Sequence, residues 1–137
     1  MLPERVPVEE FTTPDPITVT EDMSVDELLM LMREHGIRHL PVVRDGVAVG
    51  VISDRDVRLF AGLSVAEKFQ VNAGDIMSPD PLTVSSTTAL DDVAFMMSDN
   101  KVGSVIVLED DELLGIFTAT DALNALVEIV RAMRLGR

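Results

Sequence analysis

The chain has 137 residues, no cysteine and a formal net charge of −13 at neutral pH. The missing cysteines exclude disulfides and thiolate metal sites and fit a reducing cytoplasm, and the negative charge argues against nucleic-acid binding. No apolar run reaches the ~20 residues of a membrane-spanning helix, and the N-terminal MLPERVPVEE has no signal-peptide pattern. We therefore expect a cytoplasmic protein with no nucleic-acid or membrane partner.

A short extended segment, PDPITV, is predicted at residues 14–19, because a residue that precedes proline is disfavoured in the helical conformation. A helix is predicted over residues 24–35. Ser24 and Glu27 have the spacing of a capping box, and the apolar residues that follow share one face.

Two strands are predicted next, over residues 37–43 and 47–52, because both runs are rich in residues that favour strands. Asp45-Gly46 between them is a hairpin signal. A second helix is expected to open at Ser53.

The second half has the same order of elements after its own entry, PDPLTV. Its first helix is expected to begin at Thr88, with Asp91 as the capping-box partner. Strands over 102–108 and 113–117 flank the acidic run EDDE, which we interpret as a solvated turn.

The last helix opens at Thr118 and carries an apolar stripe longer than a small domain requires. The stripe consists of Leu123, Leu126, Val130 and Met133. We expect it to pack against the other half of the chain or against another subunit.

The two halves are an internal duplication. At an offset of 65, residues 6–57 align with 71–122 without a gap and share 12 identities over 52 positions. About fifty residues bury too little surface to be stable alone, so two such units are expected to share their apolar faces. The predicted fold is α+β (of α/β type), with two tandem β-α-β-β-α repeats packed in pseudo-two-fold symmetry. The predicted boundaries are 6–62 for repeat 1, 63–70 for a linker, 71–130 for repeat 2 and 131–137 for the tail of the last helix.

One corner is built twice, as GVISDRD in the first repeat and GIFTATD in the second. Glycine allows a flat group to approach the backbone, a helix N-terminus favours phosphate, and an ionised aspartate accepts hydrogen bonds from the two hydroxyls of a ribose. The same hydroxyl and carboxylate are also ordinary helix caps, each worth ~1 kcal/mol. From the residues alone, both interpretations remain open.

The ordered set PDPITV, GIRHLPVV and GVISDRD, repeated as PDPLTV, VGSVIVL and GIFTATD, resembles the cystathionine-β-synthase (CBS) domain family. The resemblance covers about residues 6–130, and a tandem pair of this kind is called a Bateman module. Family members typically bind AMP, ADP, ATP or sometimes S-adenosylmethionine in clefts between the two repeats. The resemblance implies such a regulatory ligand and no required cofactor.

The resemblance also implies which residues contact the ligand. Asp56 would hold the ribose at one site and Asp121 at the other. The first implied site consists of Ile17, Thr18, Arg38, His39, Pro41, Ser53, Arg55 and Asp56. The second, weaker site consists of Leu82, Thr83, Ser104, Thr118, Thr120 and Asp121.

The two implied sites differ in charge. Residues 14–62 hold five Arg and nine acids, whereas residues 79–127 hold one Lys and nine acids. The phosphate-facing positions of the first site include Arg38 and Arg55, and those of the second have no cation. An anionic phosphate is therefore expected at the first site, and an uncharged adenosine end or nothing at the second.

Catalysis is not expected, because His35 and His39 are the only histidines and no nucleophile stands in a recognisable spacing. Asp54 and Asp56 alone do not fill a metal coordination shell, so no metal site is expected. We predict a stand-alone regulatory protein that binds an adenosine-containing ligand and acts in trans on an unidentified protein target, as a homodimer. The alternative is a ligand-free dimerisation module with the same fold.

Overall fold

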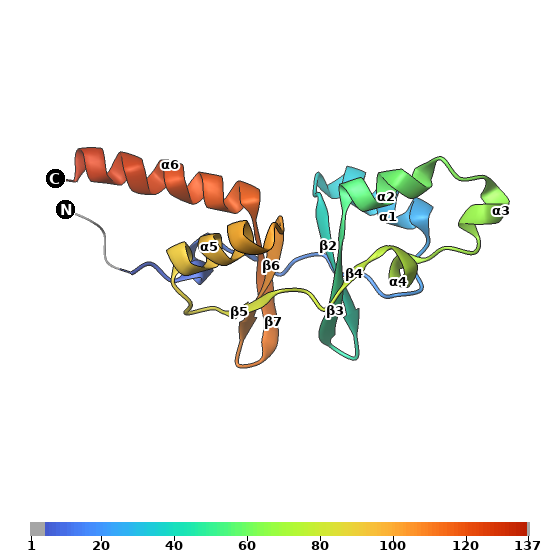
Figure 1. Ribbon diagram of the computed structural model, residues 1–137, viewed down its shortest axis with the longest axis horizontal. Helices are drawn as coiled ribbons and strands as arrows, with labels where there is room; N and C mark the ends of the chain where they lie inside the picture. Colours follow the sequence, from blue (N-terminus) through green and yellow to red (C-terminus); the bar gives the residue numbers. More distant parts are fainter. Residues whose placement is uncertain (1–4, 137) are drawn as a thin grey trace. The chain divides into compact units, whose positions relative to one another are not determined.

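The computed structural model describes residues 5–136 and has an α+β fold, as predicted (Figure 1). The chain forms two compact units, each with its own sheet and core. The central unit is Pro16–Pro81, and the terminal unit joins the described residues up to Asp15 to those from Leu82 onward.

The central unit has a three-stranded antiparallel sheet in the order β2-β3-β4. Its strands are β2 (His39–Arg44), β3 (Val47–Ser53) and β4 (Ser78–Pro79). Its helices are α1 (Val25–His35), α2 (Asp54–Ala61), α3 (Val65–Lys68) and α4 (Ala73–Ile76). Leu28 of α1, Ile52 of β3 and Val57 of α2 are completely buried in its core, so the apolar face of each element meets the others there.

The terminal unit has a four-stranded sheet in the order β1-β7-β6-β5. Its strands are β1 (Thr13–Pro14), β5 (Thr83–Ser85), β6 (Ser104–Glu109) and β7 (Glu112–Thr118). Its helices are η1 (Val8–Phe11), α5 (Leu90–Asn100) and α6 (Ala119–Leu135). The β5–β6 pair is parallel and the other pairs are antiparallel. Val8, Val93 and Phe117 form part of its buried core.

Each unit takes an edge strand from the sequence that leads into the other repeat. β1 precedes the helix of the first repeat but pairs with β7, with Thr13 opposite Ile116. β4 precedes the helix of the second repeat but pairs with β3, with Ser78 opposite Val51. The compact units therefore differ at their edges from the sequence repeats, and α3 lies inside the segment 63–70 that we predicted as a linker.

The predicted start of α1 is confirmed. Ser24 is the N-cap residue, its side chain accepts a hydrogen bond from the backbone N–H of Glu27, and Glu27 completes the capping box. The hairpin at Asp45-Gly46 is confirmed too, since both residues have the positive φ that a tight two-residue turn requires.

The predicted start of α5 is wrong. The N-cap residue is Ala89 rather than Thr88, and no side chain caps the helix. Instead, the backbone N–H of Leu90 donates to the carbonyl oxygen of Val6 at 2.7 Å. The carbonyl group of Val6, more than eighty residues away in the chain, thus accepts the hydrogen bond of a helix-end amide. The sequence pattern predicted that a nearby side chain would accept it.

The apolar stripe of α6 lies on the surface, since Leu123, Leu126, Val130 and Met133 are all exposed. None of the helices in the described part of the chain is long and apolar enough to cross a membrane.

Candidate functional site

The first repeated corner lies where β3 ends and α2 begins. Ser53 is the N-cap residue of α2. Its backbone N–H and its hydroxyl donate to Oδ2 of Asp56 at 3.0 and 2.8 Å, and the backbone N–H of Asp56 donates back to the hydroxyl at 3.2 Å. The corner is therefore a complete capping box, as the helix-cap interpretation predicts.

The capping box uses only one oxygen of the Asp56 carboxylate. The three hydrogen bonds of the box engage Oδ2 and the backbone N–H of Asp56, and none of them uses Oδ1. The cap and a ligand contact are thus compatible, because each needs a different oxygen.

The second corner repeats this geometry but engages both oxygens. The backbone N–H and hydroxyl of Thr118 donate to Oδ2 of Asp121 at 2.9 and 3.0 Å. The hydroxyl of Thr13, on β1, donates to Oδ1 of Asp121 at 3.4 Å. A ligand hydroxyl at this corner has to share or replace the contact with Thr13.

The glycines of the two corners allow neighbouring segments of the chain to pack closely against them. A side chain at Gly50 would lie 2.9 Å from the carbonyl oxygen of Ser78 and would collide with Met77. A side chain at Gly115 would collide with the carbonyl oxygen of Thr13. These glycines are therefore required by the neighbouring chain, because the segments that contain the edge strands β4 and β1 occupy the space of a side chain at both positions.

The predicted residues of the first site all lie in the central unit. His39 stands directly opposite Ser53 in the β2–β3 pair, and the carbonyl oxygen of Arg38 accepts a hydrogen bond from the backbone N–H of Asp54 at 2.8 Å. The backbone N–H of Val19 donates to the carbonyl oxygen of Pro41, which holds the segment with Ile17 and Thr18 beside β2. β2, β3 and α2 thus bring Arg38 and His39 to the Ser53 corner.

The predicted residues of the second site all lie in the terminal unit. Ser104 stands opposite Thr118 in the β6–β7 pair, and Thr83 stands opposite Ile106 in the β5–β6 pair. The carbonyl oxygen of Leu82 accepts a hydrogen bond from the backbone N–H of Ile106 at 2.9 Å. Thr120 is exposed in the first turn of α6, one residue before Asp121.

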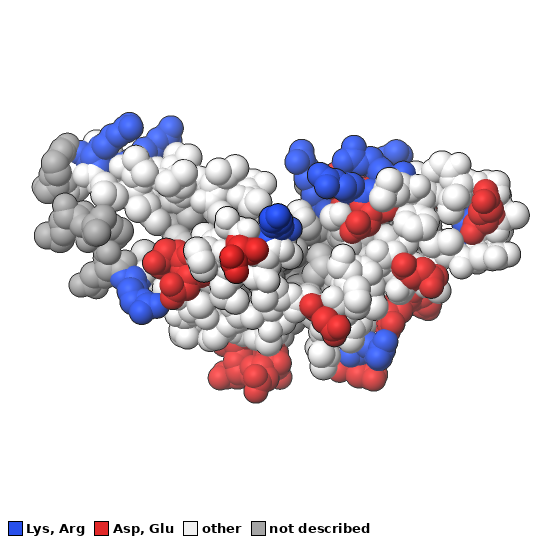
Figure 2. All heavy atoms as spheres, viewed as in Figure 1, with Lys and Arg blue, Asp and Glu red and all other residues white. Residues whose placement is uncertain are grey.

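Positive charge gathers near the first corner. Figure 2 shows Lys and Arg atoms collected over α1 and α2. Arg38 and Arg55 are both exposed there, and Arg58 is paired with Asp54 at 2.9 Å. Gly103 and Thr120 hold the corresponding positions in the terminal unit, so the two guanidinium groups have no cationic counterpart at the aligned positions there.

Sequence reasoning missed the part that the edge strands play at the corners. Thr13 contacts Asp121, and Ser78 approaches Gly50. The repeat carries a signal for both residues, since the 65-residue offset aligns the hydroxyl of Thr13 with that of Ser78, just before each PDP sequence. Residues 5–136 contain no cluster of three or more potential metal ligands among His, Cys, Asp and Glu.

A family model described as "CBS domain" matches residues 8–61 and 73–128, which is most of the chain. The chain belongs to the CBS domain family. CBS-pair proteins are generally regulatory, and some relatives contain the pair as one part of a longer enzyme.

Known CBS proteins resemble the chain in both sequence and structure. It is 38% identical over 114 residues to inosine-5'-monophosphate dehydrogenase of Korarchaeum cryptofilum; the match covers 82% of this chain and 23% of the dehydrogenase. The crystal structure of CBSX2 in complex with AMP has a TM-score of 0.76 at 31% identity and covers 90% of this chain and 98% of that one. The CBS pair of MJ0100 in complex with 5'-methylthioadenosine and S-adenosylmethionine has a TM-score of 0.79 at 25% identity, and covers 91% and 98%.

Proposed function

We propose that the protein binds an adenosine-containing ligand of the AMP, ADP and ATP class at the central corner and acts as a regulator of another protein. The observation that carries this proposal is the carboxylate oxygen of Asp56 that the capping box does not use, with exposed Arg38 and Arg55 nearby. The AMP complex of CBSX2 and the S-adenosylmethionine complex of MJ0100 support it, since both proteins share the fold.

Each part of a nucleotide has a matching group at the central corner. Oδ1 of Asp56 accepts hydrogen bonds from the ribose hydroxyls, because an ionised carboxylate is a pure acceptor. The N-terminal end of α2 and the guanidinium groups of Arg38 and Arg55 attract the phosphates. Backbone groups of Ile17 and Thr18 are left for the adenine, with Pro41 and His39 on the adjacent strand β2.

The terminal corner is the weaker site. Both oxygens of Asp121 already have partners, and Thr120 offers a hydroxyl where the central corner has Arg55. S-adenosylmethionine or an adenosine without phosphate suits this corner better than ATP, because no cation there neutralises a phosphate chain.

Ligand binding regulates only if two states of the protein differ in ligand affinity. We propose that the nucleotide shifts such an equilibrium in a cytoplasmic homodimer, and that the shift is read by a separate protein. No catalytic step, metal ion or resident cofactor is part of this proposal.

Calorimetric titration with AMP, ADP, ATP, NAD and S-adenosylmethionine tests the proposed function. We expect Asp56→Ala to weaken binding of the best nucleotide roughly tenfold or more, since a hydrogen bond to a charged group contributes ~1.5–3 kcal/mol. Asp121→Ala should weaken it less, and Asp99→Ala, an exposed carboxylate on α5, serves as the matched control. Binding heat that is absent for all five ligands at millimolar concentration would contradict the proposal.

The second candidate function is self-association without a small ligand, and the exposed stripe on α6 favours it. Leu126 and Val130 lie on this stripe beside two further apolar residues, and a continuous apolar surface of this kind is typical of an interface. Analytical ultracentrifugation should show a dimer that Leu126→Glu weakens. A dimer combined with no nucleotide binding would favour this second function.

A further inference from the structure

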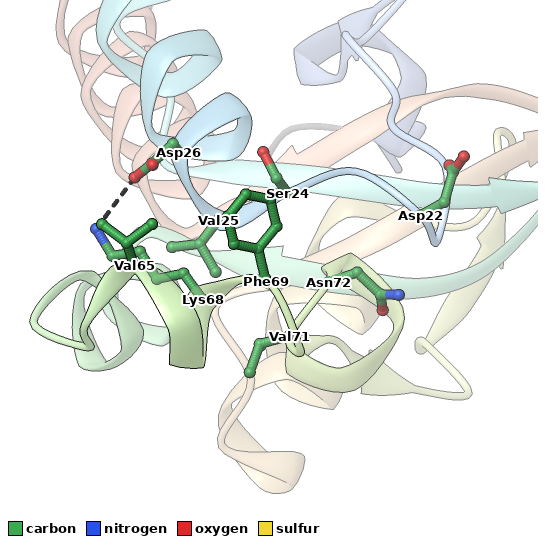
Figure 3. Close-up of a pocket in the computed structure, with 9 residues that line it drawn as sticks. All are labelled: Asp22, Ser24, Val25, Asp26, Val65, Lys68, Phe69, Val71 and Asn72. Carbon is green, nitrogen blue, oxygen red and sulfur yellow. Dashed lines mark hydrogen bonds and ion pairs between the residues drawn. The ribbon is translucent and has the colours of Figure 1, made fainter.

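A pocket of about 350 Å³ lies at the start of α1, and none of its lining residues belongs to a repeated corner. It is lined by Asp22, Ser24, Val25, Asp26, Val65, Lys68, Phe69, Val71 and Asn72. All of these residues belong to the central unit, and Figure 3 shows the Phe69 ring in the middle of them.

The pocket exposes apolar side chains that a folded domain normally covers. Phe69 has 86% of its surface exposed and Val65 has 72%, whereas Val25 beneath them is completely buried. Exposed large apolar groups beside a hollow are typical of an interaction surface. The pocket therefore offers apolar contact area to a side chain that enters it.

The rim of the pocket is acidic. The sequence EDMSVDE at residues 21–27 contains four carboxylates and no cation, and two of them, Asp22 and Asp26, line the pocket. Lys68 is the one cation of the lining, and its ammonium group pairs with Asp26 at 3.2 Å (Figure 3). Glu21 is likewise paired with Arg44, so the negative charge that is left at the rim comes from Asp22 and Glu27. This charge favours an occupant that is both apolar and cationic.

The C-terminal end of α6 has this chemistry. The 65-residue offset aligns Ala61, the last residue of α2, with Leu126, so the part of α6 from Val127 to Leu135 has no counterpart in the first repeat. Val130, Met133 and Leu135 are exposed on it, and Leu135 has 87% of its surface exposed. Arg131 and Arg134 add positive charge against a single acid, Glu128.

We propose that this pocket of the central unit receives the C-terminal end of α6 from a second copy of the chain. The apolar side chains of α6 would cover Val65 and Phe69, and Arg131 would lie near Asp22. The inference rests on the self-association proposed above and specifies which surfaces meet.

A two-fold axis would form the contact twice. The pocket and the end of α6 lie on different units of each chain, so two copies can exchange α6 ends in a closed, symmetric dimer. Two copies of the contact are needed because a stable interface buries about 1,200 Å² or more of surface, which is more than one helix end provides.

Engineered cysteines test the contact directly, because the natural chain has none. Val65→Cys protein mixed with Met133→Cys protein should form a disulfide between two different copies under mild oxidation. Val47→Cys, an exposed position on the β2–β3 hairpin, should form no such link with Met133→Cys.

The other outcomes separate the two proposals. A dimer seen by ultracentrifugation, together with no link between Val65→Cys and Met133→Cys, would overturn the pocket inference and leave self-association standing. A monomer at all concentrations would overturn both. A disulfide within a monomeric chain that carries both substitutions would show that the occupant is the chain's own α6.

Charge reversal provides a second test in the same full-length protein. Asp22→Lys and Arg131→Glu should each raise the dissociation constant of the dimer roughly tenfold, and the double variant should recover most of the loss. The circular dichroism spectrum must stay unchanged, so that the effect reports assembly rather than folding. A double variant that is weaker than either single variant would contradict a contact between these charges.

Discussion

The two oxygens of the Asp56 carboxylate have different environments, which is why the cap interpretation and the ligand interpretation can be separated by mutation. Oδ2 completes the capping box with Ser53, and Oδ1 takes no part in the box. Sequence reasoning identified both possible roles of this residue. It could not divide them between the two oxygens, because that division depends on three-dimensional geometry.

Ser53→Ala should lower the free energy of unfolding by about 1 kcal/mol, since it removes the hydroxyl that caps α2. It should leave the affinity for adenosine, which has no phosphate, almost unchanged because Oδ1 of Asp56 is still present. Asp56→Ala should cost similar stability and also lose adenosine binding. Urea unfolding and adenosine titration of both variants check the two expectations. Equal losses of adenosine affinity would mean that the cap alone matters.

The turn of the β6–β7 hairpin places Asp110 and Asp111 at φ values of 51° and 65°. The left-handed region costs a residue with a Cβ roughly 1–2 kcal/mol, although Asp tolerates it better than most. Asp111→Gly should therefore raise the free energy of unfolding by roughly 0.5–1 kcal/mol. Asp111→Asn is the control, because it removes the charge but keeps the side chain. If Asn stabilises as much as Gly in urea unfolding, charge repulsion rather than backbone conformation is the cause.

The guanidinium group of Arg44 donates to both oxygens of Glu21, at 2.6 and 2.8 Å. These hydrogen bonds lower the pKa of Glu21, with a smaller contribution from the charge of Arg44. Since the folded-state pKa lies below the unfolded one, the pair stabilises the fold above the unfolded-state pKa, and this effect is lost as pH falls through the folded-state value. Arg44→Gln should return the pKa of Glu21 toward its ordinary value in a carbon-13 NMR titration. An unchanged titration would show that the pair does not persist in solution.

At the scale of elements, short sequence patterns correctly predicted the features that depend on contacts between residues close together in the chain. The capping box of α1 and the Asp45-Gly46 turn depend on residues close together in the chain, and the structure confirms both. The start of α5 was mispredicted because its first amide is satisfied by Val6. β1 and β4 have two residues each. A segment this short cannot show the alternation of apolar and polar residues by which strands are predicted, so the sequence did not indicate that they pair with distant strands.

The edge strands explain why replacing either corner glycine should lower the free energy of unfolding. Gly115→Ala should lower the free energy of unfolding by about 2–3 kcal/mol, because its methyl group meets the rigid backbone carbonyl of Thr13. Gly50→Ala should cost less, about 1–2 kcal/mol, because the nearest group is the flexible side chain of Met77 and the backbone carbonyl oxygen of Ser78 lies farther away, at 2.9 Å. Gly62→Ala is the control, since nothing lies within 4 Å of a Cβ there. Thermal unfolding of the three variants gives the order, and equal losses at Gly50 and Gly115 would contradict the backbone clash.

At the scale of the whole molecule, the duplicated fold carries an unequal distribution of charge. The chain has a net charge of −13, yet Arg38 and Arg55 are exposed near one of its two carboxylate corners and Gly103 and Thr120 replace them at the other. The sequence predicted this inequality, because it follows from residue types at aligned positions. The contact between Thr13 and Asp121, which engages the second oxygen of that carboxylate, could be seen only in the structure.

The structure of the protein crystallised with AMP is the measurement that tests the central claim most directly. The account predicts AMP at the corner of the central unit, with its ribose hydroxyls within hydrogen-bond distance of Oδ1 of Asp56 and its phosphate near Arg38 or Arg55. AMP bound only at Asp121, or at neither carboxylate under saturating conditions, would contradict it.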